Sequence, residues 1–232
     1  MSFDLIVWDA SNNPPTTLEE ADQRDEDLAE LFSAPLGAAG ERPVPGERML
    51  GLVARVEDML GRLSAGEGGG FWATPPAVGD DFVVMTFSRS IAVHALNVLK
   101  ELCSDSNIVF YDPQSGKLYR PGGGSGGDEG ELICSDGTVV CRPTDATIMK
   151  VVRSVSNEDW FVTLDLGARF VQVGLGVNAG MSDGVLSLEV RESDTTAVQK
   201  FQVTDLQLCV DVFLAFRRND PKWRVYFVPR EE

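Results

Sequence analysis

Hydrophobic and polar positions in the first 120 residues switch between the periods of strands and helices. An apolar run at residues 3–8 predicts a β-strand. Pro14 and Pro15 follow in the loop after it and exclude a continuous helix there. Residues 17–20 have the form of a capping box, in which the Thr17 hydroxyl accepts from an early helix N–H and Glu20 reaches back to the cap. This pattern predicts a helix that runs to about residue 32.

Two more segments of this half place apolar residues at helical spacing. These residues are Met49, Val53, Val56, Leu60 and Leu63 in one segment, and Ile91, Ala95, Val98, Leu99 and Leu102 in the other. Residues 81–87 and 108–111 are strand-like. The first half therefore predicts three helices and a small sheet.

The second half follows a run rich in Gly and Ser at residues 121–130, which we interpret as a linker because such runs gain too little on ordering to offset their entropy. Asp136-Gly137 between two apolar runs predicts a two-residue hairpin, in which Cys134 faces Val139 and Cys141 faces Leu132. A helix is expected over residues 146–155.

Period-two alternation then predicts strands around residues 160–164, 171–175 and 186–190. A capping box at Thr204 begins a helix that carries Leu206, Val210, Phe213 and Leu214 on one face. Alternation at Trp223, Val225 and Phe227 indicates a last strand.

The predicted fold is α+β, with two modules that each pack a small, mostly antiparallel sheet against helices. The expected boundaries are an N-terminal module at residues 1–120, a linker at residues 121–130 and a C-terminal module at residues 131–232.

The net charge of −16 changes the expected partners. Nucleic-acid binding needs a positive field, so DNA and RNA are not expected. A basic protein would be attracted, although solubility alone also accounts for an acidic surface. The chain starts without a charged leader or a long apolar stretch, so we expect a cytoplasmic protein that does not enter a membrane.

Residues that carry chemistry are few and scattered. The one histidine, His94, lies in a predicted helix without an evident nucleophile beside it. The four cysteines lack metal-ligand spacing and are expected to be free thiols, mostly buried, with Cys134 and Cys141 only diagonal neighbours on one face of their hairpin. The glycines of residues 122–127 match a phosphate-loop pattern, but carboxylates follow them instead of an apolar helix. We therefore predict no catalytic residue, metal site or cofactor.

Acidic and aromatic residues of the first module are the candidates for binding a partner. Asp22, Asp25, Glu26, Asp27 and Glu30 concentrate carboxylates along the first predicted helix, with Asp22, Asp25, Glu26 and Glu30 at the spacing of one solvated face. Trp72 follows three glycines, and Asp80 precedes a strand. A plain solvated face and an ordinary packing role for Trp72 are the alternatives.

Four segments also carry a resemblance. The start MSFDLIVWD, the segment PTTLEEA at residues 15–21 and the segment VFYDPQSG at residues 109–116 resemble a bacterial family of small cytoplasmic proteins, some of which are similar to immunity proteins of polymorphic or contact-dependent toxin systems. The helix, acidic turn and Trp at residues 213–223 are similar to the end of immunity-type domains.

The resemblance implies an immunity protein that binds a cognate toxin and blocks its active site or its substrate groove, and the net charge of this chain favours a basic toxin. Two alternatives remain at this point. One is an interaction or scaffold module with an unrelated cytoplasmic partner. The other is a hydrolase that uses carboxylates such as Asp80, Asp81 or Asp183.

Overall fold

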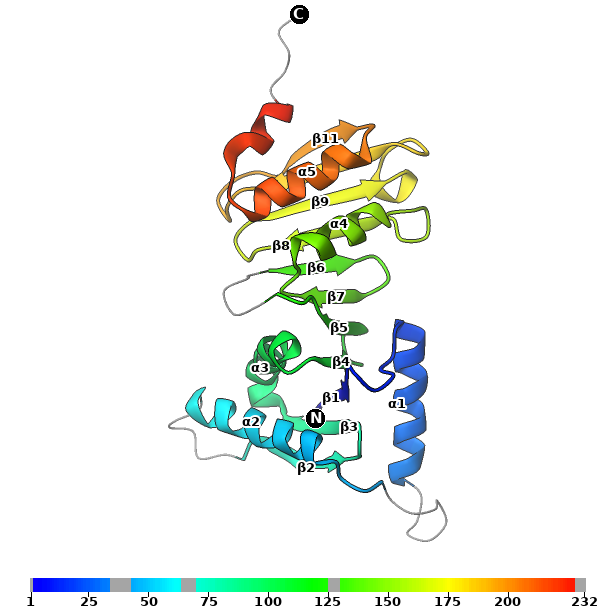
Figure 1. Cartoon of the computed structure of the whole chain (residues 1–232), viewed down its shortest axis with the longest axis vertical. Helices are drawn as coiled ribbons and strands as arrows, with labels where there is room; N and C mark the ends of the chain where they lie inside the picture. The colour runs from blue at the N-terminus through cyan, green and yellow to red at the C-terminus, as the bar shows by residue number, and fades with distance from the viewer. Residues whose placement is uncertain (1, 34–42, 64–69, 125–129, 228–232) are drawn as a thin grey trace, which may run out of the picture. The chain divides into compact units, whose positions relative to one another are not determined.

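The computed structural model describes residues 2–33, 43–63, 70–124 and 130–227 (Figure 1). Within these residues the chain forms five α-helices and eleven strands in mostly antiparallel pairs, so the predicted α+β class is confirmed. The chain divides into two compact units, Met1–Pro121 and Gly122–Glu232. The division into two modules with a linker stays a prediction, and residues 125–129 of that linker lie outside the described residues.

The N-terminal unit contains five strands in the order β5-β4-β1-β3-β2, each antiparallel to its neighbours. They are β1 Ser2–Asp9, β2 Trp72–Val78, β3 Phe82–Ser88, β4 Ile108–Asp112 and β5 Lys117–Pro121. The pattern predicted β1, β3 and β4 but missed β2 and β5. Pro75 and Pro76 are unusual in a strand, so the sequence pattern did not indicate β2. The register of β2 shifts twice along β3, which an edge strand tolerates because only one of its sides is paired.

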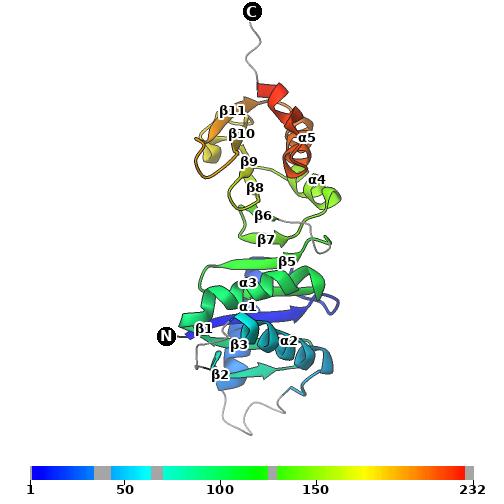
Figure 2. The same cartoon turned by 90° about the vertical axis from the view of Figure 1, so that its left-hand side faces the viewer.

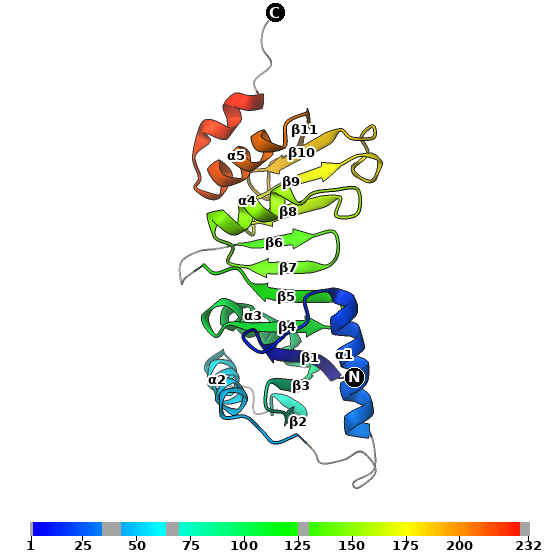
Figure 3. The same ribbon diagram turned by 45° about the vertical axis from the view of Figure 1, so that its right-hand side comes forward.

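Helices cover both faces of this sheet, as Figures 1 and 3 show. Helix α1 Leu18–Ser33 lies on one face, where Ala21 packs with Ile6 and Trp8 of β1. Helices α2 Glu47–Leu63 and α3 Ala92–Asp105 lie on the other face. A short 3-10 helix, η1 Arg89–Ile91, directly precedes α3. The strand period of two directs alternate β1 side chains to these two cores.

The inward face of α2 differs in part from the prediction. Its buried residues are Met49, Leu52, Val56 and Leu60. Val53 is only half-buried and Leu63 is 60% exposed, because the 3.6-residue period places position 52 rather than 53 above the sheet and the sheet does not cover the last turn.

The C-terminal unit contains six strands in the order β7-β6-β8-β9-β10-β11. They are β6 Glu131–Cys134, β7 Thr138–Cys141, β8 Phe161–Asp165, β9 Phe170–Leu175, β10 Leu186–Arg191 and β11 Gln199–Val203. Helices α4 Asp145–Arg153 and α5 Leu206–Arg217 lie side by side on one face of this sheet (Figure 2). A 3-10 helix, η2 Val177–Ala179, follows β9. The predicted helices, and the strands predicted up to residue 190, are confirmed here, and β11 was missed.

The hairpin of β6 and β7 has a different register from the predicted one. Ile133 lies opposite Val139 and Glu131 lies opposite Cys141. The Gly137 N–H donates to the Cys134 carbonyl at 3.2 Å and Gly137 has φ +84°, so the loop has three residues and ends in a left-handed glycine. The one-residue shift places Cys134 and Cys141 on opposite faces of the hairpin, and the predicted diagonal contact on one face is therefore wrong. No disulfide joins Cys134 to Cys141.

The first residues of the predicted linker pair with the backbone that follows β7. The Gly122 N–H donates to the Cys141 carbonyl at 2.7 Å, and the Gly124 N–H donates to the Arg142 carbonyl at 3.0 Å. A side chain at Gly122 would lie 2.4 Å from the Cys141 carbonyl oxygen, so only glycine fits this close approach.

The predicted last strand is wrong. Residues Pro221–Phe227 form a 3-10 helix, η3, instead. The Lys222 N–H donates to the Asp220 carboxylate at 3.0 Å, a local bond that begins a turn rather than a strand. Trp223 is 4% exposed and packs edge-on against Phe216 of α5, with ring centroids 5.7 Å apart. It therefore completes the core of the C-terminal unit.

Asp145 at the start of α4 holds the end of α5. Its carboxylate accepts from Arg217 at 2.6 Å and also from Arg218. Partial burial raises the pKa of Asp145, but the hydrogen bonds from the two guanidinium groups outweigh this effect and lower the pKa below its ordinary value.

The cap of α5 gives a first testable prediction. Its N-cap is Asp205, whose carboxylate accepts from the Gln207 N–H at 2.8 Å, rather than the predicted Thr204. Asp205→Ala should lower the free energy of unfolding by about 1 kcal/mol in urea denaturation, because the first turn loses a partner for its free N–H groups. Thr204→Ala is the matched control and should have almost no effect. A larger loss in Thr204→Ala than in Asp205→Ala would contradict this cap.

Candidate functional site

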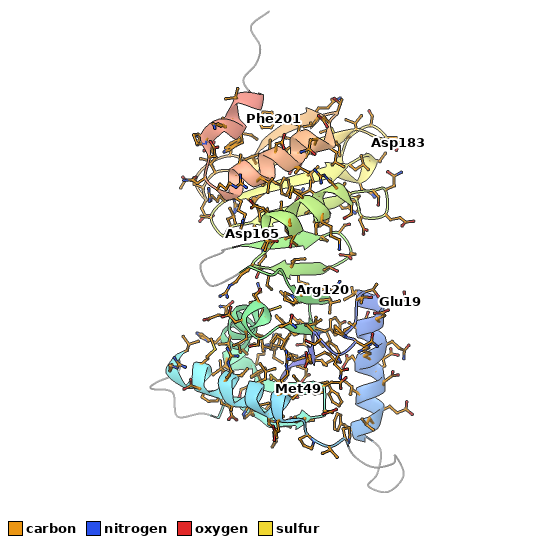
Figure 4. The ribbon with its side chains drawn as sticks, viewed as in Figure 1. Glu19, Met49, Arg120, Asp165, Asp183 and Phe201 are labelled. Carbon is orange, nitrogen blue, oxygen red and sulfur yellow. The ribbon has the colours of Figure 1, made fainter. Side chains whose placement is uncertain are left out.

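Helix α1 carries the most concentrated charge of the described residues. Its 16 residues include seven carboxylates and a single basic residue, Arg24. Of the predicted site residues, Asp22, Glu26, Asp27 and Glu30 are exposed, and we call these four the acidic surface. Glu19 in the first turn points away from the sheet as well (Figure 4). Within the described part of the chain, no carboxylate of α1 enters an ion pair, so this charge is available to a partner.

The first turn of α1 is fixed by its own side chains. The Thr17 hydroxyl accepts from the Glu20 N–H at 3.2 Å. The Glu20 carboxylate accepts from the N–H of Thr16 at 2.6 Å, one residue earlier than predicted, and from the Thr16 hydroxyl. These bonds, led by the one from the Thr16 N–H, lower the pKa of Glu20. The acidic surface therefore starts from a capped helix.

Asp25 does not share the solvated face on which the sequence placed it. It is half-buried, in the stripe with Leu18, Ala21 and Leu28 that packs towards the sheet. Desolvation, followed by the charges of Asp22, Asp4 and Glu26, raises the pKa of Asp25. The spacing from Asp22 to Asp25 was compatible with either face, and burial of Ala21 decides it.

Tyr111 of β4 fastens α1 to the sheet. Its ring is buried, and its hydroxyl donates to the Asp22 carboxylate. Burial, followed by the hydrogen bond to Asp22, raises the pKa of the Tyr111 hydroxyl well above its ordinary value. The sequence did not identify Tyr111 as part of the site. The only signal was its place in the segment that carries the family resemblance.

The rest of that segment forms the turn between β4 and β5. Asp112 is 3% exposed, and its carboxylate accepts from the Gln114 and Ser115 N–H groups and, at 2.6 Å, from the Ser115 hydroxyl. The Gln114 side-chain oxygen accepts from the Asp4 N–H of β1 at 3.0 Å. In this chain the residues of the segment therefore hold strands together.

Trp72 and Asp80 are not brought to the acidic surface. Trp72 stacks on Phe87 with ring centroids 4.7 Å apart, and its Nε1 donates to Glu57 of α2 at 2.8 Å. Since α2 and α1 cover opposite faces of the sheet, Trp72 packs on the side away from α1. Asp80 is exposed in the β2–β3 turn, where its carbonyl oxygen would lie 2.3 Å from a side chain at Gly46. This contact explains the glycine before α2.

Groups that could carry chemistry are dispersed through the described residues. His94 is exposed on α3, as predicted. Burial raises the pKa of the Cys134 and Cys209 thiols to about 12, so neither is a thiolate at neutral pH. Among the described residues, no group of three or more His, Cys, Asp or Glu side chains could hold a metal ion.

Comparisons with known proteins found no family model, curated protein or solved structure that matches this chain. In the described residues, the helices are too short or too polar to cross a membrane.

The environment of Asp25 gives a second prediction. Because its folded-state pKa is raised, ionisation of Asp25 opposes folding above that pKa, and this penalty disappears as the pH falls through it. Asp25→Asn should therefore raise the free energy of unfolding by about 0.5 kcal/mol at pH 7, with no gain at pH 3. Urea denaturation at the two pH values measures the difference.

Glu30→Gln is the control for this change, since Glu30 is exposed on the same helix. It should gain less than Asp25→Asn at pH 7. An equal gain in both variants would mean that Asp25 is as solvated as Glu30.

Proposed function

We propose that this chain is an immunity protein that binds a basic cognate toxin in the cytoplasm through the acidic surface of α1. The observation that supports the proposal most strongly is the row of exposed carboxylates on α1 without an ion-pair partner among the described residues. Such a row attracts a cationic protein over a distance of about one Debye length and favours one orientation of approach.

The anchoring of α1 supports the same proposal. A binding helix loses less entropy on association if it is already held in place. Here the capping bonds fix the first turn, Ala21 is fully buried against the sheet, and Tyr111 holds Asp22. The edge of the acidic surface nearest the sheet is therefore rigid in the free protein.

The length of α1 suits occlusion of a groove. Sixteen residues of α-helix extend about 24 Å. A helix of this length with a continuous acidic face can cover cationic side chains that would otherwise hold a phosphate or another anionic substrate. The length and charge of α1 support neutralisation by steric and electrostatic occlusion.

A third prediction tests the acidic surface directly. The variant Glu26→Lys, Asp27→Lys, Glu30→Lys should weaken binding of the toxin domain encoded beside this gene by about 10- to 100-fold, because several rim charges are reversed together. Most of the loss should appear in the association rate and should shrink at high salt. Surface plasmon resonance at two salt concentrations gives both readings, and growth of cells that co-express the toxin gives the functional reading.

The matched control is Glu101→Lys, Glu158→Lys, Asp183→Lys, which makes the same change in net charge at three exposed positions outside α1 in the sequence. It should bind and protect nearly as well as the unaltered chain. Equal losses in the two triple variants would reduce the proposal to a general effect of charge. Capture of an unrelated cytoplasmic protein, with no binding of the neighbouring toxin, would instead favour an interaction module.

A further inference from the structure

The triplet Ser-Asp-Gly occurs twice in the chain, at residues 135–137 and 182–184, and the two copies contain its two Asp-Gly pairs. An aspartate that precedes glycine is prone to isomerise, because the glycine nitrogen can attack the neighbouring carboxyl carbon with no side chain in its way. The identical triplets give both aspartates the same immediate sequence. A difference in their reactivity in the folded chain must therefore come from the structure around them.

The first triplet is the three-residue loop between β6 and β7, and its reacting groups are engaged in hydrogen bonds. The Gly137 N–H donates to the Cys134 carbonyl at 3.2 Å, so the attacking nitrogen belongs to the turn. The Asp136 carboxylate accepts from the Thr138 N–H at 2.8 Å and from the Thr138 hydroxyl at 2.9 Å. Isomerisation of Asp136 would have to break these three hydrogen bonds.

The second triplet lies in the loop between η2 and β10 and forms a different turn. The Val185 N–H donates to the Ser182 carbonyl at 3.1 Å, which places Asp183 and Gly184 at the centre of the turn. Of these two residues only Gly184 has a positive φ, at +71°, which fits a type II turn. The N–H of the peptide that joins Asp183 to Gly184 takes no part in the hydrogen bond of the turn.

The reacting groups of the second triplet are not engaged. Asp183 is exposed at the edge of the C-terminal unit (Figure 4), and neither its carboxylate nor the Gly184 N–H has a hydrogen-bond partner among the described residues. The Asp183 Oδ1 and the Gly184 nitrogen both lie 3.9 Å from the position of a Cβ built on Gly176, so the two groups are on one side of the turn. The Asp183–Gly184 peptide can rotate without losing a hydrogen bond of its own.

We propose that Asp183 is a site of spontaneous isoaspartate formation in the folded protein, from which Asp136 is protected. The Gly184 nitrogen bonds to the side-chain carboxyl carbon of Asp183, and the carboxyl OH leaves with the amide hydrogen as water, which gives a cyclic imide. Water then opens the imide. Cleavage of the new bond restores aspartate, whereas cleavage of the original peptide bond leaves isoaspartate. One water leaves and one enters, so the conversion needs no oxidant or reductant.

The product keeps the negative charge of Asp183 but lengthens the backbone of the turn by one methylene. The change lies between η2 and β10 and not within a strand, so the pairing of β10 with β9 is not interrupted. The modified chain can therefore accumulate in the folded state. Both triplets are outside α1 in the sequence, and the inference does not rest on toxin binding.

The test incubates the full chain at neutral pH in water enriched in heavy oxygen, with one sample folded and one unfolded in guanidinium chloride. Peptide mapping by mass spectrometry then measures, at each Asp-Gly pair, the uptake of one heavy oxygen and the loss of cleavage by a protease that cuts before aspartate but not before isoaspartate. In the folded chain Asp183 should convert about 10- to 100-fold faster than Asp136, because three hydrogen bonds oppose the reaction at Asp136. In the unfolded chain the two rates should be similar. Equal rates in the folded chain, or the same ratio in both samples, would overturn the proposal.

Variants test the assigned roles of the glycine and of the hydrogen bonds. Gly184→Ala should slow conversion of Asp183 by about tenfold, because a methyl group hinders the attacking nitrogen. Gly180→Ala is the matched control, since Gly180 also has φ +71° but does not follow an aspartate, and it should leave the rate at Asp183 unchanged. Thr138→Ala removes one donor to Asp136 and should speed conversion there several-fold. Equal effects of the two glycine variants on Asp183, or an unchanged rate at Asp136 in Thr138→Ala, would show that the structural explanation is wrong.

Discussion

The burial of β1 on both of its faces is the constraint on which the N-terminal unit depends. Four successive side chains, Leu5, Ile6, Val7 and Trp8, are at most 3% exposed. Since neighbouring side chains of a strand point to opposite faces, such a run can only be buried if helices cover the sheet from both sides. This requirement separates α1 from α2 and α3. The acidic surface of α1 and the two helices α2 and α3 therefore belong to different faces of one sheet.

Much of the fold could be predicted because period and burial agree in the long elements. The helices α2, α3 and α5 have strong apolar periodicity, α1 begins with a capping box, and each of the four was found in the sequence. The missed strands are short or carry residues that mask them, such as Pro75 and Pro76 in β2 and the exposed Gln199, Lys200 and Gln202 in β11. Local bonds decided the remaining details, including the cap at Asp205 and the three-residue loop before β7, because neighbouring residues offered nearly equivalent alternatives.

The candidate site could be predicted only as a helix with many carboxylates. The inward position of Asp25 depends on how α1 packs on the sheet, where Ala21 contacts β1 and Tyr111. Both β1 and Tyr111 are distant from Asp25 in the sequence. The pairing of Trp72 with Glu57, and of Arg55 with Ser106, joins residues 15 and 51 positions apart. No sequence motif indicates either pairing, because each forms only when α2 packs on the sheet.

The prolines of β2 have a consequence for how the N-terminal unit behaves among copies of itself. Pro75 and Pro76 cannot donate backbone hydrogen bonds, and the irregular register of β2 against β3 disturbs the outer row of carbonyl and N–H groups. Another strand would find no regular ladder to extend at this edge. The β2 edge is therefore a poor template for the edge-to-edge pairing that regular exposed strands invite.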